Sequence, residues 1–132
     1  EISSMNFWGF MPSLFDGMGA MFEEFLKERG KKVIGWDEIL DGSAVPSTVV
    51  MSYRGHAPAS RAFEKDMKVI LAPNRWCYYD YDQEEIKDIP ANHHLFITLR
   101  KAYTYDYMQY LNKDVAHKAD DLLLGIQACV YS

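Results

Sequence analysis

The stretch Lys31-Lys32-Val33-Ile34-Gly35-Trp36-Asp37-Glu38-Ile39-Leu40 decides the fold of this 132-residue chain. It is a short apolar run that ends in a tryptophan and two carboxylates. Three further apolar runs follow, and an aromatic residue closes or follows each of them. Short runs with apolar residues on both faces are typical of buried parallel strands. We therefore predict strands at Lys32–Trp36, Thr48–Tyr53, Lys68–Ala72 and about Leu122–Tyr131.

The segments between the predicted strands carry helix signals. Pro58 suits the first turn of a helix that reaches about Lys65, and Leu95–Tyr103 is predicted as another short helix. Strand, crossover and strand at this spacing indicate βα units with a parallel sheet, so the expected fold class is α/β. The stretch 74–92 is rich in Trp and Tyr and has no clear period, which is typical of a functional loop. The stretch 105–119 also has no clear assignment.

The first thirty residues are predicted to form a separate N-terminal part. An aromatic segment opens the chain, and apolar side chains then fall at helical spacing from about Ser13 to Arg29. Gly30 stands where a left-handed C-cap would end this helix. We expect the α/β part to span residues 31–132.

Charge and hydropathy exclude two classes of partner. The formal net charge is −5, and no segment is basic enough to follow a phosphate backbone, so nucleic acid is not an expected partner. No apolar run is long enough to span a membrane, and no charged-then-apolar leader opens the sequence. The chain begins at Glu1 without a Met, as a mature form or an excerpt of a longer protein would.

The two cysteines and four histidines show no ligand pattern. Cys77 and Cys129 form no CxxC motif and have no His at ligand spacing, so we expect no metal or cofactor. Two small buried residues are the favoured interpretation, and a disulfide between them stays open. The histidines are expected on the surface or in loops.

Aromatic and carboxylate side chains gather at the ends of the predicted strands, where ligands of parallel α/β folds bind. Aromatic rings contact sugar C–H faces and carboxylates accept hydrogen bonds from sugar hydroxyls, so this set suits a sugar. The alternative is that the aromatic residues only close the top of the sheet. Asp37 and the adjacent Glu38 would point to opposite faces of a strand, which argues against a two-carboxylate hydrolase built from this pair. The strand-end residues are Trp36, Asp37, Tyr53, Arg54, Tyr78, Asp80 and Tyr131.

Five motifs along the chain resemble those of a known family. Gly30–Leu40 is followed by Val50-Met51-Ser52-Tyr53-Arg54-Gly55, Val69-Ile70-Leu71-Ala72-Pro73, Tyr78-Tyr79-Asp80-Tyr81-Asp82-Gln83 and Leu124-Gly125-Ile126-Gln127-Ala128-Cys129-Val130-Tyr131. In this order they resemble the second half of the catalytic barrel of family-twenty glycoside hydrolases, the β-N-acetylhexosaminidases, over about residues 20–132. The resemblance implies a partial (β/α)8 TIM barrel, with these strands as about the fifth to the eighth.

The resemblance also implies roles for residues at the strand ends. Trp36, Tyr53 and Tyr131 match the wall of the pocket for the sugar's N-acetyl group. Tyr78 matches the tyrosine that bonds the acetamido oxygen, and Asp80 the carboxylate that holds sugar hydroxyls; Asp37 is a further substrate-binding candidate. In this family the acetamido oxygen of the substrate attacks the anomeric carbon, with retention. The expected partners are glycans with terminal N-acetylhexosamine, and family habit implies a secreted or periplasmic enzyme.

The sequence departs from the family's pattern at the catalytic machinery. Tyr53 and Tyr131 stand where the family usually has Trp. The Asp-Glu pair that orients the acetamido group and protonates the leaving oxygen belongs before the matched region, and the chain stops at Ser132, one residue before a Glu that is usual in the family. We therefore expect a substrate-binding fragment that is inactive alone and self-associates through uncovered sheet edges.

Three alternatives remain open. The chain could be a carbohydrate-binding module without chemistry, or a structural piece without a ligand. The opening stretch Ser4–Phe15 also resembles a segment of bacterial sugar-phosphate nucleotidyltransferases, which would make the chain a mosaic or a fragment of such an enzyme.

Overall fold

The computed structural model describes residues 21, 24–25, 28–42, 47–83 and 96–130, and its two compact units are Glu1–Lys32 and Val33–Ser132. In the first unit, Met21, Glu24, Phe25 and Glu28 are helical. Gly30 has φ +58°, which agrees with the predicted left-handed C-cap. The remainder of the helix predicted over residues 13–29, the aromatic residues 1–11 and the opening stretch 4–15 lie outside the described residues.

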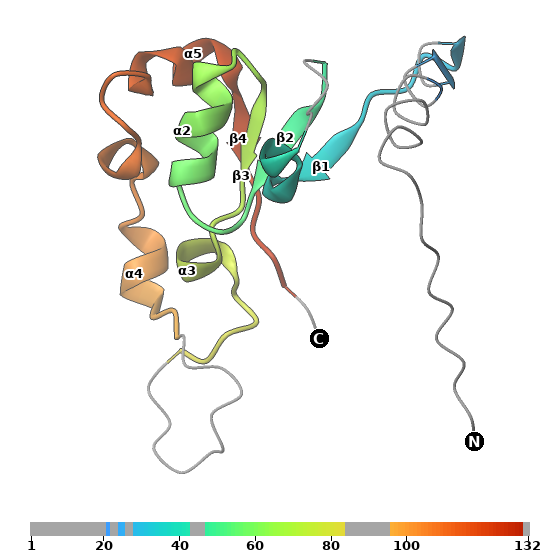
Figure 1. Ribbon diagram of the computed structural model, residues 1–132. Helices are drawn as coiled ribbons and strands as arrows, with labels where there is room; N and C mark the ends of the chain where they lie inside the picture. Colours follow the sequence, from blue (N-terminus) through green and yellow to red (C-terminus); the bar gives the residue numbers. More distant parts are fainter. Residues whose placement is uncertain (1–20, 22–23, 26–27, 43–46, 84–95, 131–132) are drawn as a thin grey trace, which may run out of the picture. The chain divides into compact units, whose positions relative to one another are not determined.

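The second unit is built on a sheet of four parallel strands (Figure 1). The strands confirm all four sequence predictions and are shorter than predicted. They are β1 (Ile34–Trp36), β2 (Val49–Ser52), β3 (Val69–Leu71) and β4 (Leu123–Ile126). Their order in the sheet, β1-β2-β3-β4, is their order in the sequence. Each strand of a (β/α)8 barrel neighbours the next one, whereas the order reverses in doubly wound sheets, so this is the topology of a partial barrel.

Helices and 3₁₀ turns connect the strands. The two predicted helices are present as α2 (Ala57–Glu64), with Pro58 in its first turn, and α4 (Leu99–Tyr103). The Thr98 side chain caps α4 by accepting a 3.1 Å hydrogen bond from the Lys101 amide. The stretches without a predicted element contain the short elements α3 (Asn74–Cys77), η2 (Tyr107–Tyr110) and η3 (Ala116–Lys118). Two further elements correct the prediction: η1 (Asp37–Asp41) forms where Asp37 and Glu38 were expected to be extended, and α5 (Ala119–Leu122) includes Leu122, the predicted start of the last strand.

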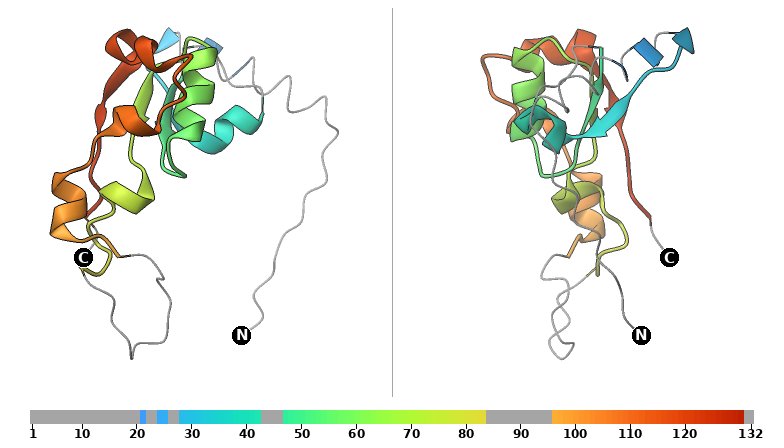
Figure 2. Two further views of the ribbon diagram at one scale, coloured as in Figure 1. Left: turned by 90° about the vertical axis from the view of Figure 1, so that its left-hand side faces the viewer. Right: turned by 45° about the vertical axis from the view of Figure 1, so that its right-hand side comes forward.

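The hydrophobic core lies between α2 and one face of the sheet (Figure 2). Phe63 of α2 and the strand residues Val50, Val69 and Leu71 are fully buried there. The opposite face carries no helix among residues 33–42, 47–83 and 96–130, and Ile34 and Leu124 are 55% and 53% exposed. The sheet therefore buries one face and leaves apolar side chains on the other.

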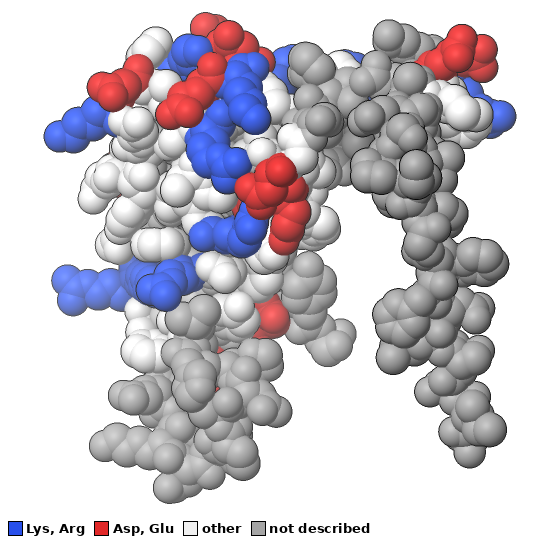
Figure 3. Space-filling model, viewed as in Figure 1, with Lys and Arg blue, Asp and Glu red and all other residues white. Residues whose placement is uncertain are grey.

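Charged side chains of both signs lie close together on the face shown in Figure 3. Asp41, for example, contacts both Arg54 at 3.1 Å and Arg61 at 3.0 Å. Within the part of the chain that the structure describes, no helix is long and apolar enough to cross a membrane.

Candidate functional site

A hollow of about 290 Å³ lies beyond the carboxyl ends of the strands. It is lined by Trp36, the last residue of β1, Tyr53, which follows β2, Tyr78, which follows α3, and Glu38 of η1. The Trp36 and Tyr53 rings meet edge to face, with centroids 5.3 Å apart. Two aromatic surfaces at an angle can contact the apolar parts of a small ligand from two sides. Parallel strands thus bring together three residues that lie far apart in the sequence.

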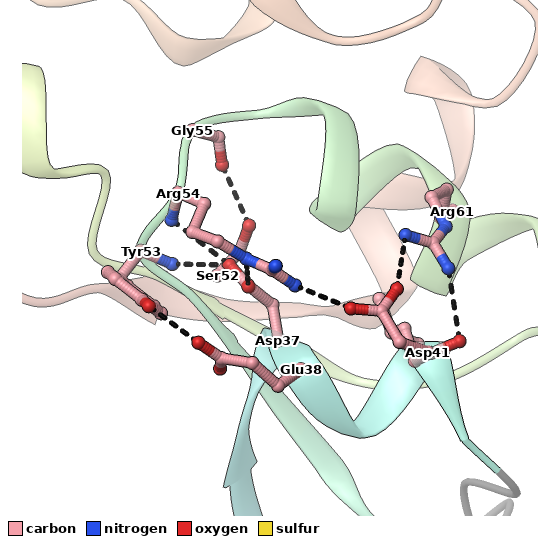
Figure 4. Close-up of polar contacts among 9 residues, drawn as sticks. Asp37, Glu38, Asp41, Ser52, Tyr53, Arg54, Gly55 and Arg61 are labelled. Atoms are coloured by element: carbon pink, nitrogen blue, oxygen red, sulfur yellow. Dashed lines mark hydrogen bonds and ion pairs between the residues drawn. The ribbon is translucent and has the colours of Figure 1, made fainter.

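The buried carboxylate of Asp37 fixes the backbone of this wall (Figure 4). Its Oδ2 accepts hydrogen bonds from the backbone amides of Tyr53 at 2.9 Å and Arg54 at 3.0 Å, and its Oδ1 accepts from Arg54 Nε. The Asp37 side chain has no exposed surface. Arg54 also forms an ion pair with Asp41, so a network of ion pairs connects η1 with the end of β2. Asp37 points to this network, whereas Glu38 points to Tyr53.

Glu38 and Tyr53 form the polar part of the hollow's wall. The Tyr53 hydroxyl donates a 2.5 Å hydrogen bond to Glu38 Oε1 (Figure 4). This hydrogen bond, with help from the Glu38 backbone amide, holds the pKa of the Glu38 carboxyl below its usual value. The same bond raises the pKa of the Tyr53 phenol. Glu38 is therefore an ionised hydrogen-bond acceptor at neutral pH.

Tyr78 is held to the last described segment of the chain. It forms a parallel bridge with Cys129, where the Tyr79 amide donates to the Cys129 carbonyl at 2.8 Å and the Cys129 amide donates to the Cys77 carbonyl at 2.7 Å. Cys77 and Cys129 are free and buried, as the favoured interpretation predicted. Burial raises the pKa of the Cys77 thiol to about 11. Backbone pairing rather than a disulfide positions Tyr78.

His56 lies in the loop before α2, in agreement with the prediction of a surface or loop histidine, but its side chain is buried. It precedes α2, and its ring stacks on Tyr110 with centroids 4.9 Å apart and meets Trp76 edge to face at 5.1 Å. Its Nε2 lies 2.6 Å from the Tyr105 hydroxyl. Burial lowers the pKa of His56 to about 4 and raises that of Tyr105. The cluster joins α2, α3 and the 105–110 segment.

Comparison with known proteins identifies the family. The profile of "Glycosyl hydrolase family 20, catalytic domain" matches residues 12–132. The chain belongs to glycosyl hydrolase family 20. The match begins before residue 20, where the resemblance was expected to start, and it includes the stretch in which the N-terminal helix was predicted. The sequence resemblance to the β-N-acetylhexosaminidase family is confirmed.

Individual family 20 proteins resemble the chain over most of its length. It is 32% identical over 111 residues to a beta-hexosaminidase of Porphyromonas gingivalis and 30% identical over 112 residues to one of Vibrio furnissii, covering 83% of the chain in each case. The chain spans 14% and 18% of the length of these relatives. A Vibrio harveyi GH20 exo-β-N-acetylglucosaminidase, solved in complex with N-acetylglucosamine, superimposes with a TM-score of 0.68 at 24% identity, covering 90% of this chain and 20% of that one. The fold is thus part of a family 20 barrel.

The structure brings together three of the six predicted site residues. Trp36, Tyr53 and Tyr78 line the hollow, and Asp37 is buried behind it. Asp80 lies in an exposed turn and is not among the described lining residues, while Tyr131 falls outside the described residues. Within the described part, no group of three or more His, Cys, Asp or Glu side chains could hold a metal ion.

Glu38 is the lining residue that the sequence interpretation missed. Trp36 ends β1 and Glu38 lies in the first turn of η1, so a 3₁₀ turn rather than a shared strand face brings the two side chains together. The signal that could have found Glu38 is its position just after a strand end, where ligands of parallel α/β folds bind. The His56 cluster had a weaker signal, which was the recurrence of Tyr105, Tyr107 and Tyr110 in an unassigned segment.

Proposed function

We propose that this chain forms the substrate-binding half of a β-N-acetylhexosaminidase site. The Trp36–Tyr53–Tyr78 hollow would hold the N-acyl group of a terminal N-acetylhexosamine. Asp80 would accept hydrogen bonds from sugar hydroxyls, and Tyr131 would complete the aromatic wall. The observation that carries this proposal is the convergence of three aromatic residues, from the ends of β1 and β2 and from the segment after α3, on one small hollow in a family 20 chain.

The geometry of the hollow suits this role. The edge-to-face contact of Trp36 and Tyr53 leaves ring surface for an acyl chain, and Trp36 is 44% exposed. Tyr78 lies on the same hollow, where its hydroxyl would donate to the carbonyl oxygen of the acyl group. In substrate-assisted hydrolysis that oxygen is the nucleophile, so walls that restrict its position favour attack on the anomeric carbon.

We propose a positioning role for Asp37 in place of direct sugar contact. Both of its carboxylate oxygens accept hydrogen bonds from protein groups, and its side chain has no exposed surface. A sugar hydroxyl would have to displace Arg54 or a backbone amide to reach it. Asp37 instead fixes the main chain at Tyr53 and so the position of that ring.

We propose that the chain alone does not hydrolyse glycosides. Glu38 is the one carboxylate among the described lining residues, and its lowered pKa keeps it ionised at neutral pH. A general acid needs a proton to give at the working pH, and its pKa is therefore usually raised. Glu38 has the opposite shift. The acid of the complete enzyme would come from another part of the barrel.

Self-association of the isolated chain is a second part of the proposal. Within the described residues β1 pairs only with β2 and β4 only with β3, so each outer strand offers an unpaired edge. Ile34 and Leu124 add exposed apolar surface on these strands. Unpaired edges beside apolar side chains favour pairing with another chain.

Calorimetric titration with N-acetylglucosamine tests the binding role. We expect heat of binding at millimolar sugar that is lost in Tyr78→Phe, because this change removes the hydroxyl and keeps the ring. Tyr79→Phe is the matched control, since the neighbouring Tyr79 does not line the hollow. An absence of heat with the unsubstituted chain, or an equal loss in both variants, would contradict the proposal. Release of a chromogenic aglycone from an N-acetylglucosaminide well above a blank would contradict inactivity.

A further inference from the structure

The wall of the hollow contains a charged group that an N-acetyl group does not need. Glu38 lines the hollow with Trp36, Tyr53 and Tyr78, and its carboxylate is bonded to the Tyr53 hydroxyl at 2.5 Å. The methyl end of an acetamido group has no hydrogen-bond donor for a carboxylate. Placing a methyl group against it would remove water from the charge without replacing the lost hydrogen bonds.

The polar pair presents acceptors and no free donor. The Tyr53 hydroxyl has one hydrogen, which it donates to Glu38 Oε1, so the Tyr53 oxygen can only accept a further bond. An ionised carboxylate accepts about four hydrogen bonds, and the described side chains supply Glu38 with one, from Tyr53. Acceptor positions therefore remain on both residues. A ligand group that matches them must carry a hydrogen-bond donor.

From this arrangement we infer that the hollow prefers an N-acyl group with a hydroxyl at its end, such as the N-glycolyl group of an N-glycolylhexosamine. The acyl carbons would lie against the Trp36 and Tyr53 rings, and the terminal hydroxyl would donate to Glu38 or to the Tyr53 oxygen. This inference rests on the proposed function, because it assigns the N-acyl group to the same hollow. It makes Glu38 and Tyr53 specificity-determining residues.

A bare ammonium group, as in unacylated glucosamine, fits the arrangement less well. It would meet one carboxylate in a wall that is otherwise aromatic, and Glu38 is exposed to water, which weakens an ion pair. An ammonium group also lacks the carbonyl oxygen that Tyr78 would hold under the proposed function. The N-glycolyl group keeps that carbonyl and adds the donor.

The test compares three sugars on the full 132-residue chain by calorimetric or NMR titration. The probes are the methyl β-glycosides of N-glycolylglucosamine, N-acetylglucosamine and glucosamine. Because the wall is open to solvent, we expect N-glycolylglucosamine to bind about 10-fold tighter than the N-acetyl sugar, close to the lower limit of what a hydrogen bond to a charged group contributes. Glucosamine should bind most weakly.

Two variants assign the preference to the polar pair. Glu38→Leu should abolish the roughly 10-fold difference in affinity between the N-glycolyl and N-acetyl sugars, whereas Glu64→Leu, the same change at an exposed site on α2, should keep that difference. Tyr53→Phe should change the preference without abolishing binding, and the unfolding midpoint of each variant checks that it is folded.

The failure of this inference can be told apart from failure of the proposed function. Equal or tighter binding of the N-acetyl sugar, tighter binding of glucosamine, or a preference that survives Glu38→Leu would overturn the specificity while N-acyl binding stood. No binding of any sugar to the unsubstituted chain would overturn both.

Discussion

The carboxylate of Asp37, the first residue of η1, accepts a 2.9 Å hydrogen bond from the backbone amide of Tyr53, the residue that follows β2. This bond crosses from one strand end to the next and sets where the Tyr53 ring meets Trp36. The same carboxylate also accepts the Arg54 amide at 3.0 Å. Removing a buried charged acceptor that has several donors costs a large amount of folding free energy, because each donor is left without a partner.

Asp37→Ala should therefore lower the free energy of unfolding by about 2–3 kcal/mol, because two partly buried backbone amides and the Arg54 guanidinium lose their acceptor. Asp41→Ala is the matched control. Asp41 contacts Arg54 and Arg61 at an exposed position, where water screens ion pairs and they contribute little to stability, so its loss should be clearly smaller. Urea denaturation of both variants measures the difference. Equal losses in the free energy of unfolding would show that the buried Asp37 stabilises the fold no more than the exposed Asp41 does.

Gly35→Ala should disturb η1, because a Cβ at residue 35 would lie 2.7 Å from Cγ2 of Ile39. We expect a loss of about 1–2 kcal/mol, typical of overpacking, with weaker sugar binding as Glu38 moves with η1. The double variant Gly35→Ala/Ile39→Ala should be more stable than the sum of the two single losses predicts, since it removes the clash. Additive losses in a double-mutant cycle would refute a direct steric conflict.

Acidification should destabilise the fold through His56. Its pKa is lowered to about 4, against about 6.5 in an unfolded chain, so the native state holds the ring neutral. As the pH falls below about 6.5 the unfolded state takes up the proton first, and stability declines by about 3 kcal/mol by pH 4; above pH 7 the effect is absent.

An NMR titration of the His56 ring in the folded chain reports this pKa directly. Denaturation at a series of pH values measures the free energy of unfolding. In His56→Gln it should decline less toward low pH than in the unsubstituted chain, whereas His117→Gln, at an exposed site, should show the full decline. A His56 ring that titrates near its ordinary value would rule the effect out.

The isolated chain should self-associate through the sheet face opposite α2, which carries no helix among residues 33–42, 47–83 and 96–130. Sedimentation velocity should show species larger than the monomer that increase with concentration. Ile34→Lys and Leu124→Lys place a charge on that face and should shift the chain toward monomer. Leu99→Lys is the control, because Leu99 is 80% exposed on α4 and lies outside the sheet. A monomer at all concentrations, or an equal shift with Leu99→Lys, would be incompatible with this surface.

Sequence reasoning found the elements whose signals are local. The four strands were predictable because runs such as Val69–Leu71 are short, apolar and bounded by breakers. Trp36 and Tyr53 were placed at one site because the carboxyl ends of parallel strands share an edge.

Other features depend on contacts that no local pattern encodes. His56 carries no sequence signal for burial, since Tyr105 and Tyr110 reach it from about fifty residues away. The deep burial of Asp37 depends on Arg54 and two backbone amides that only tertiary structure brings to it. The residue pattern correctly separated Asp37 from Glu38 but took their segment as extended, whereas it forms the 3₁₀ turn η1.

The most direct measurement of the central claim is saturation-transfer NMR of N-acetylglucosamine with the full chain. If the Trp36–Tyr53–Tyr78 hollow holds the N-acyl group, the acetyl methyl protons should receive the strongest transfer of all sugar protons. That transfer should be lost in Trp36→Ala, while Tyr103→Ala, a change at a 90% exposed aromatic away from this hollow, should leave it intact. Equal transfer to the ring and methyl protons, or methyl transfer that persists in Trp36→Ala, would contradict the account.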